Sequence, residues 1–503
     1  MNEKRYVGKE WTKSHTLKSA LWFLLHFAIY ILIVFALLFG KNMSYLSEYF
    51  KTEGANYLYA GFCTLLLFGI TYFYFLFENK EILMSGKTIA LIFTVLDLHL
   101  LLSCLIGYNF AIYARPVALV ALLIVVLLGR RDAIFMNIIA ALLVFVIDTF
   151  AMPEVSNKEC YSSLIIAFSA GMIALFCGSR ARTRLSIVLI SFWIILPMVV
   201  VIFLLEITGL VNAGAQLTEE PIMYRIWTQM GFGTLGGVAS TVLFLMVLPM
   251  FEWTFNWLTA FRLRELTGSD SEILKTLKEK APGTYNHSMM VAQLAEASAA
   301  AIGENVDYAR AAALYHDVGK LHNPEHFTEN QDGYNLHDEL TPELSADLIR
   351  SHAKDGYTLI RSNHLPDFLA DVAMQHHGTM PIRYFYAKAL KMTDGELNIE
   401  DFSYVGPKPQ TKIAAIIMIC DASEAAVRAV DARKPEEAER AIRAVIEERM
   451  DLEQFSECDI TMVDLTKIRQ ALVNTLTGVY HHRVKYPNIK YKRTENGTKG
   501  ESV

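Results

Sequence analysis

The chain has 503 residues, of which 53% are hydrophobic and 19% are charged, so it is long enough for two or three domains. Its formal net charge of −6 is mild, which argues against a general role in binding nucleic-acid polymers. The six cysteines show no CxxC spacing, so neither a disulfide framework nor a zinc knuckle is indicated.

The first half of the chain is predicted to be a helical membrane bundle over residues 20–258. A spanning helix needs about 20 mostly apolar residues. Residues 1–19 form a basic tail, and no small-residue cleavage site follows the first apolar run, so that run is interpreted as an anchor rather than a removable signal. About eight spans are predicted, the third and fourth nearly continuous at Gly107: 20–40, 58–77, 88–107, 108–128, 133–150, 162–179, 185–210 and 231–255.

The orientation of this bundle is predicted from basic residues in its short connections. Lysines and an arginine precede the first span, Arg130-Arg131 separates the fourth and fifth, and Arg180, Arg182 and Arg184 separate the sixth and seventh. With an inside N-terminus and eight spans, all three clusters lie on the cytoplasmic side. The C-terminal half is then cytoplasmic as well.

Asp97, His99, Asp148 and Glu206 are among the ionisable residues that fall within the predicted spans. Such groups are costly in a bilayer and often functional. No second residue completes an ion path, so the simpler interpretation is that they lie near helix ends or pair inside the bundle. The outside loops, 41–57, 151–161 and 211–230, are too short to fold as a sensory domain.

The second half of the chain reads as an ordinary soluble protein. Residues 259–284 are predicted to be a linker helix, in which Ser269 and Glu272 have capping-box spacing. Residues 285–485 are predicted to be an all-α domain, and 486–503 a flexible tail. The helices are expected where apolar residues recur at three- and four-residue steps: 286–302, 306–317, 342–354, 366–377, 411–432, 435–450 and 464–481.

Histidines are concentrated in this half, with nine of the fourteen between His287 and His377. Imidazole and carboxylate together suit divalent transition metals. Adjacent helical residues point about 100° apart, so His316 and Asp317 could reach two metals, or the carboxylate could bridge both. Asp421 follows a strongly apolar run, where an unpaired carboxylate would be costly. The predicted ligands are His287, His316, Asp317, His352, His376, His377 and Asp421.

The ligands are expected at helix ends and interiors. His287 is predicted to begin one helix, His352 to end another, and His376-His377 to close a third before Gly378. The remaining histidines of this region lie in polar contexts and are left outside the ligand set: His322, His326, His337 and His364.

Several strings in this half resemble a known family. HDVGK at 316–320 is similar to the signature of the HD superfamily of metal-dependent phosphohydrolases. With APGTYNHS, HFTENQ, NLHDELTPELSADLIRSHAKDG, QHHGT, GPKPQTK and DASEAAVR in order, the chain resembles the seven-transmembrane HD-domain family, the PgpH-type cyclic di-AMP phosphodiesterases of bacteria. The match covers the bundle in layout and residues 259–485 in motifs. That family usually carries a large extracytoplasmic domain after the first span, where this chain has only residues 41–57.

The resemblance implies hydrolysis of cyclic di-AMP to linear pApA, and it places the family's metal ligands on the same seven residues. Two divalent transition-metal ions are expected, with iron or manganese favoured over magnesium and zinc left open. The hypothesis is that Asp317 bridges the two ions, which activate a water for in-line attack on phosphorus. Lys320 is a second catalytic candidate that would contact a phosphate oxygen. Its alternative is a solvated lysine packed along its helix.

The expected partners are a cyclic dinucleotide and the lipid bilayer, with a homodimer left open. The expected location is the bacterial cytoplasmic membrane, multi-pass, with the N-terminus and HD domain inside. One alternative is a cyclic di-GMP phosphodiesterase of the HD-GYP kind, against which stands the absence of a GYP triplet after His376-His377. Another is a receptor that binds nucleotide without cleaving it, although such a domain should have lost ligands. A transporter with a regulatory domain has little support from the sparse intramembrane charges.

Overall fold

The structure is a computed structural model that divides the chain into two compact units, one ending at Leu266 and one beginning at Thr267. We call them the membrane unit and the soluble unit. The predicted C-terminal tail, most of the predicted N-terminal tail, Arg182 and Ser269 lie outside the described residues. The structure describes residues 12–39, 46–152, 155–181, 183–212, 222–268, 271–392, 396–430 and 435–479.

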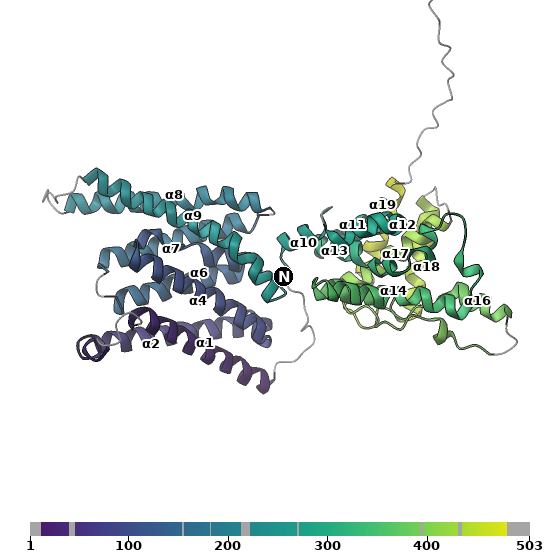
Figure 1. Cartoon of the computed structure of the whole chain (residues 1–503), viewed down its shortest axis with the longest axis horizontal. Helices are drawn as coiled ribbons and strands as arrows, with labels where there is room; N and C mark the ends of the chain where they lie inside the picture. The colour runs from purple at the N-terminus through teal and green to yellow at the C-terminus, as the bar shows by residue number, and fades with distance from the viewer. Residues whose placement is uncertain are drawn as a thin grey trace, which may run out of the picture. The chain divides into compact units, whose positions relative to one another are not determined.

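The predicted all-α class is confirmed, since the described residues contain helices and one isolated bridge between Pro381 and Ser403, but no strand. In the membrane unit the long helices run alongside one another (Figure 1). Their bounds are α1 (Lys13–Phe39), α2 (Leu46–Glu78), α3 (Lys80–Met84), α4 (Gly86–Asn109), α5 (Leu119–Leu127), α6 (Arg130–Phe150), α7 (Asn157–Gly178), α8 (Arg184–Asn212), α9 (Ile222–Thr254) and α10 (Ala260–Leu266).

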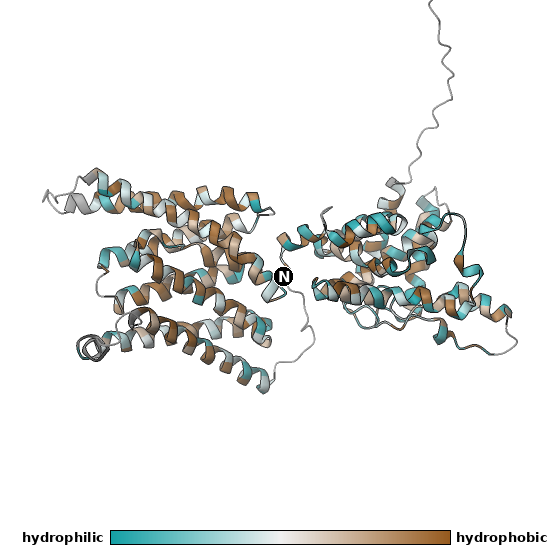
Figure 2. Cartoon of the chain, in the orientation of Figure 1, coloured by the Kyte–Doolittle hydropathy of each residue, from teal (hydrophilic) through white to brown (hydrophobic). Residues whose placement is uncertain are grey.

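Seven helices within the described residues are long and apolar enough to cross a bilayer, namely α1, α2, α4, α6, α7, α8 and α9. Apolar residues cover these helices along most of their length, whereas the soluble unit is mixed (Figure 2). The chain is therefore a multi-pass membrane protein with a helical bundle, as predicted. The number of membrane-length helices is seven rather than about eight.

The difference lies in the segment predicted as the fourth span, 108–128, which is not one continuous helix. After α4 ends, Pro116 follows a short 3-10 turn (Ile112–Ala114), and only the nine residues of α5 are α-helical. Proline lacks a backbone N–H and disfavours helical geometry in the residue before it.

Buried charges in the bundle are mostly paired. Arg115 makes two hydrogen bonds to Asp148, at 2.6 and 2.9 Å, and donates a third to the Ser103 carbonyl at 3.1 Å. Glu206 accepts from Lys158 at 3.1 Å and from Arg225 at 3.0 Å. Two of the four intramembrane groups named from the sequence are therefore held by cations from other segments.

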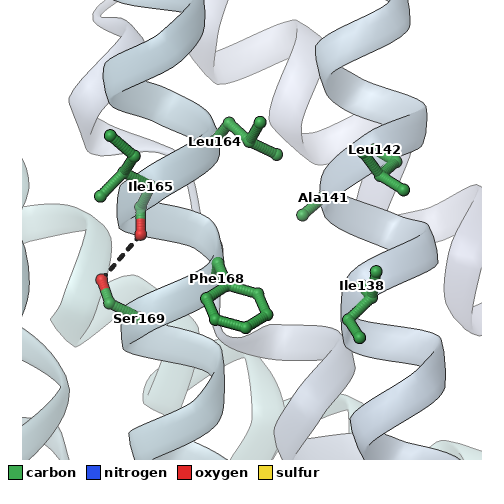
Figure 3. A pocket seen from close by; sticks show the side chains of 7 residues that line it. All are labelled: Ile138, Ala141, Leu142, Leu164, Ile165, Phe168 and Ser169. Atoms are coloured by element: carbon green, nitrogen blue, oxygen red, sulfur yellow. Dashed lines mark hydrogen bonds between the residues drawn. The ribbon is translucent and has the colours of Figure 1, made fainter.

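A shallow hollow between α6 and α7 is lined almost entirely by carbon (Figure 3). Its one hydroxyl, on Ser169, donates to the Ile165 carbonyl at 2.8 Å. The hollow therefore offers apolar contacts only. Its lining residues are Ile138, Ala141, Leu142, Leu164, Ile165, Phe168 and Ser169.

The soluble unit is built from short helices whose ends carry ordinary caps. Asn305 and Thr341 accept hydrogen bonds from backbone amides in the first turns of their helices, and Gly303 takes the left-handed conformation (φ +79°) after α12. The bounds are α11 (Glu272–Lys280), α12 (Pro282–Ile302), α13 (Val306–Tyr315), α14 (Pro342–Ser362), α15 (Asp367–Gln375), α16 (Arg383–Met392), α17 (Lys412–Ala429), α18 (Pro435–Asp451) and α19 (Met462–Val479).

Three details differ from the sequence expectations. The residue that caps α11 is Ser271, whose hydroxyl meets the Tyr315 hydroxyl at 2.6 Å instead of a backbone amide. Helix α14 continues to Ser362, so His352 lies in its interior rather than at its end. Helix α16, which buries Phe385 and Ala389, was not among the helices expected from the sequence.

Candidate metal site

The seven predicted ligands converge in the soluble unit from five helices or their ends. His287 lies in the second turn of α12, His352 in α14 and Asp421 in α17. His316 and Asp317 follow α13, and His376 and His377 follow α15. Three overlapping groups have ligand atoms within 4.8 Å of one another: Asp317, His352, His376 and His377; His287, His316 and Asp317; and His316, His376 and Asp421.

Asp317 lies at the centre of the cluster and is 1% exposed. One carboxylate oxygen, Oδ1, is 3.3 Å from His352 Nε2 and 3.6 Å from His376 Nε2. The other, Oδ2, is 3.2 Å from His316 Nε2 and 3.7 Å from His287 Nε2. The two oxygens therefore face two different sets of imidazoles, as a bridging carboxylate requires.

Backbone carbonyls fix the orientation of three of these imidazoles. The Nδ1 atoms of His316, His352 and His376 lie 2.6, 2.6 and 2.8 Å from the carbonyl three residues earlier. A carbonyl can only accept, so each Nδ1 carries a proton, and in the tautomer that a metal requires each ring presents its Nε2 lone pair to the cluster. Hydrogen bonds of this kind commonly set the tautomer of metal-ligating histidines.

Several donor atoms of the cluster have no suitable hydrogen-bond partner within the protein. His316 Nε2 and Asp317 Oδ1 are buried without a hydrogen-bond partner. His352 Nε2 and His376 Nε2 are 3.2 Å apart, although both would be acceptors in the tautomers fixed above. Two facing lone pairs repel, and a cation between them removes the repulsion. The residues present therefore fit divalent metal ions.

His287 and Asp421 form the second side of the cluster. The two ring nitrogens of His287 meet carboxylates, with Nε2 3.0 Å from Asp421 Oδ1 and Nδ1 2.9 Å from Glu424 Oε2. His377 Nδ1 is 3.8 Å from Asp421 Oδ2, and its ring stacks on Tyr404 with centroids 4.2 Å apart. Glu424 therefore orients His287, and Tyr404 supports His377.

The protonation states follow from burial and these neighbours. Burial opposes ionisation of Asp317, but His316 and Lys320 outweigh it and hold its pKa well below the usual range. Burial lowers the pKa of His352 to about 3, so its imidazole is neutral at physiological pH. Burial would also lower the pKa of His287, but Asp421 and Glu424 raise it to about 10. Without metal, His287 is thus an imidazolium between two carboxylates.

Lys320 is closely held beside the cluster. Its Nζ lies 2.8 Å from Asp317 Oδ2 and 2.8 Å from Glu329 Oε1, and 4.9 Å from the centre of the Phe327 ring. Thr284 donates to the same Glu329 oxygen at 3.1 Å. The ammonium therefore has a fixed position next to the central carboxylate, unlike a lysine that lies along a solvated helix face.

Sequence reasoning missed three residues that shape the site, namely Glu329, Tyr404 and Glu424. Glu424 follows Asp421 by three residues, and the i, i+3 spacing on one helix face could have indicated it. Tyr404 and Glu329 lie in loops, where the sequence carries no periodic signal. The histidines left outside the ligand set, 322, 326, 337 and 364, are absent from the three donor groups of the described residues.

Both units match known families. Residues 55–259 match the family described as "7TM receptor with intracellular HD hydrolase", and residues 284–426 match the HD domain family. The chain belongs to the seven-transmembrane HD family. The HD match begins three residues before His287 and ends after Asp421, so it contains all seven predicted ligands. Divalent metal binding is consistent with this family and with the donor atoms described above.

Relatives of known activity are similar over most of the chain. A protein of Bacillus subtilis (strain 168) named "Cyclic-di-AMP phosphodiesterase PgpH" is 37% identical over 83% of this chain and 57% of its own length. The protein of that name in Listeria monocytogenes is 39% identical over 75% of this chain and 50% of its own. This member of the seven-transmembrane HD family therefore spans about half the length of those relatives.

A solved structure is similar to the soluble unit. It is the crystal structure of the L. monocytogenes PgpH HD domain in complex with cyclic di-AMP, 48% identical, covering 42% of this chain and 99% of the crystallised chain, with a TM-score of 0.41.

Proposed function

We propose that this protein is a membrane-bound, metal-dependent phosphodiesterase that hydrolyses cyclic di-AMP to linear pApA. The observation that carries the proposal is the convergence of seven donor residues around Asp317, whose two oxygens face separate sets of imidazoles. The activity named for the relatives of Bacillus subtilis and Listeria monocytogenes supports the choice of substrate.

We assign the finer features of the site as part of this proposal. His287, His316 and Asp421 would hold one ion, and His352, His376 and His377 the other, with Asp317 shared between them. Imidazole-rich donor sets with carboxylates favour iron or manganese. When bound, such ions lower the pKa of a water and neutralise charge on the phosphoryl oxygens.

The side chains of the protein have complementary roles in the reaction. Water adds to one phosphorus, the bond to the 3′ oxygen breaks, and the product keeps a terminal 5′ phosphate. Lys320, held by Asp317 and Glu329, would place its positive charge next to a phosphate oxygen. Glu424 and the backbone carbonyls hold the imidazoles in place, so little reorganisation is needed when substrate arrives.

The test uses full-length protein in membranes with added manganese and separates the products by chromatography. Cyclic di-AMP should be converted to pApA, and Asp317→Asn should reduce turnover by at least about a hundredfold, since loss of the shared carboxylate affects both ions. Faster turnover of cyclic di-GMP would favour an HD-GYP-like enzyme. Binding of nucleotide and metal without product would favour a non-catalytic receptor. Either result would overturn the proposal.

We also propose a bacterial cytoplasmic membrane location with the N-terminus and soluble unit inside. Arg130 and Arg131 begin α6 and Arg184 begins α8, and two membrane-length helices separate these points, so these basic residues share one side of the bundle. An N-terminus on that same side requires that the segment between α4 and α6 also crosses the membrane, which is part of this proposal. Labelling of single cysteines placed at Ser179 and Ser156 should modify only Ser156→Cys from outside. A homodimer stays a prediction that the mass of the solubilised protein tests.

A further inference from the structure

One pair in the membrane unit differs from the ion pairs of Asp148 and Glu206 because its carboxylate faces a histidine instead of an arginine or lysine. His26, in the middle of α1, faces Asp97, in the middle of α4, with Nδ1 3.9 Å from Asp97 Oδ2. The two side chains are 8% and 12% exposed. The His26 ring stacks on Phe93 with centroids 4.8 Å apart and on Trp22 at 6.0 Å, so its position is set by packing on both faces.

The polar atoms of this pair are unsatisfied. Neither ring nitrogen of His26 has a hydrogen-bond partner, and neither does Asp97 Oδ1. A distance of 3.9 Å is too long for a direct hydrogen bond. The hydroxyl of Tyr30, one helical turn from His26 on α1, is also buried without a partner. Buried polar groups without partners are rare, and each calls for an explanation.

No other charged side chain of the described residues neighbours Asp97. On α1 the neighbouring titratable group is Tyr30, and on α4 it is Cys104, which lies within electrostatic range of Tyr30. On α2, the hydroxyl of Thr71 donates to the Leu67 carbonyl, and that of Tyr72 meets Ser19.

The remaining charged and titratable groups of the packed elements are engaged elsewhere or lie on the surface. His99 is on α4 but contacts Ser103, and Arg115 is engaged with Asp148. On the short α3, which also contacts α1, Lys80 and Glu81 are both exposed. Among the described residues of these elements, His26 is thus the cation available to Asp97.

We propose that His26 and Asp97 form a proton-binding site inside the membrane bundle. With the proton bound, His26 is an imidazolium whose Nδ1 faces the Asp97 carboxylate at ion-pair distance, and the pair is neutral overall. Release of the proton to water leaves a neutral imidazole and a buried carboxylate without a counter-charge. An isolated carboxylate in this environment is costly, so the bound proton stabilises the packing of α1 on α4. Histidine is the side chain that changes charge near neutral pH.

Solid-state nitrogen NMR of the full-length protein in liposomes, labelled at its histidines with ¹⁵N, tests this site directly. Loss of signal in His26→Leu identifies the His26 nitrogens. At neutral pH both His26 nitrogens of the wild type should have the ¹⁵N chemical shift of a protonated ring. In Asp97→Asn at the same pH, the two His26 nitrogens should have the chemical shifts of a neutral ring. The control is His15→Gln, a partly exposed position in the first turn of the same helix, which should leave the His26 signals unchanged. A neutral His26 in the wild type, or the same protonation in Asp97→Asn, would overturn the proposal.

A second measurement guards against variants that are simply unstable. Removing one member of a buried ion pair is destabilising, whereas replacing both with apolar residues is often tolerated. The apparent unfolding temperature near neutral pH should therefore fall in His26→Leu and in Asp97→Leu, and the double variant should recover part of the loss. A double variant whose loss equals the sum of the single losses would contradict a proton shared between the two residues.

Discussion

At the scale of single residues, the site depends on how each imidazole is oriented and protonated before a metal binds. Backbone carbonyls orient three of the rings through their Nδ1 atoms, and Glu424 orients His287 in the same way. The carbonyls fix the tautomer of their rings, whereas Asp421 and Glu424 together raise the pKa of His287 and retain a proton on it. When no metal is bound, His287 therefore differs in protonation from His352, whose pKa is lowered by burial.

Metal binding should release a proton from His287. Its pKa of about 10 means that the ring is protonated at pH 7.5, and ligation needs an unprotonated Nε2. We expect release of about one proton per site at pH 7.5, with apparent affinity rising with pH until about pH 10. Calorimetric titration in buffers of different ionisation enthalpy measures this number. A binding enthalpy independent of the buffer would contradict the assignment.

Loss of the partner of His287 should weaken metal binding without removing a ligand. Glu424→Gln removes the charge that faces Nδ1 while keeping the shape of the side chain. We expect metal affinity to fall by about 10–100-fold. The matched control is Glu436→Gln, an exposed position in the first turn of α18. Equal metal content in both variants after dialysis would show that Glu424 has no such role.

At the scale of elements, the site exists because helices meet closely where the ligands are attached. Gly319, two residues after Asp317, packs against α14 at the turn that carries His352. A Cβ at this position would lie 1.9 Å from the His352 carbonyl oxygen and 2.4 Å from the Gly356 nitrogen. Both contacts are backbone, so the clash cannot be relieved by a side-chain rotation.

Substitution of this glycine should separate the two halves of the site. In Gly319→Ala the added methyl pushes α14 away from Asp317, and we expect a loss of at least about 2 kcal/mol of stability. Metal content should fall with it. Thermal unfolding of the purified protein measures the first effect and metal analysis the second. Gly69→Ala, where a Cβ meets no atom within 4 Å, should change neither.

At the scale of the whole molecule, the chain separates its tasks between two units. The donor residues and the groups that orient them all lie after Thr267, and the unsatisfied His26–Asp97 pair lies in the membrane unit. Each unit has its own buried core, with the membrane core running from α1 to α10. The metal site therefore does not need the membrane helices for its ligands.

The soluble unit alone should fold and bind metal. A protein comprising residues 267–503 contains every donor and every orienting contact described above, so we expect it to be helical and to retain bound metal. Circular dichroism and metal analysis after size-exclusion chromatography test this. Asp317→Asn in the same protein is the control and should lower its metal content. An unfolded product would show that the membrane unit contributes to the stability of the site.

The sequence by itself determined most of the apolar spans and most helices of the soluble unit, and it singled out the seven candidate donors, because hydrophobic period and ligand chemistry are local properties. Only the tertiary structure decided that Asp317 faces two sets of imidazoles, that Glu424 meets His287, and that His26 meets Asp97. It also decided that residues 108–128 form a turn and a short helix, whose Arg115 is held by Asp148. These features join residues far apart in the chain, and such contacts depend on how helices pack, which leaves no periodic pattern in either segment.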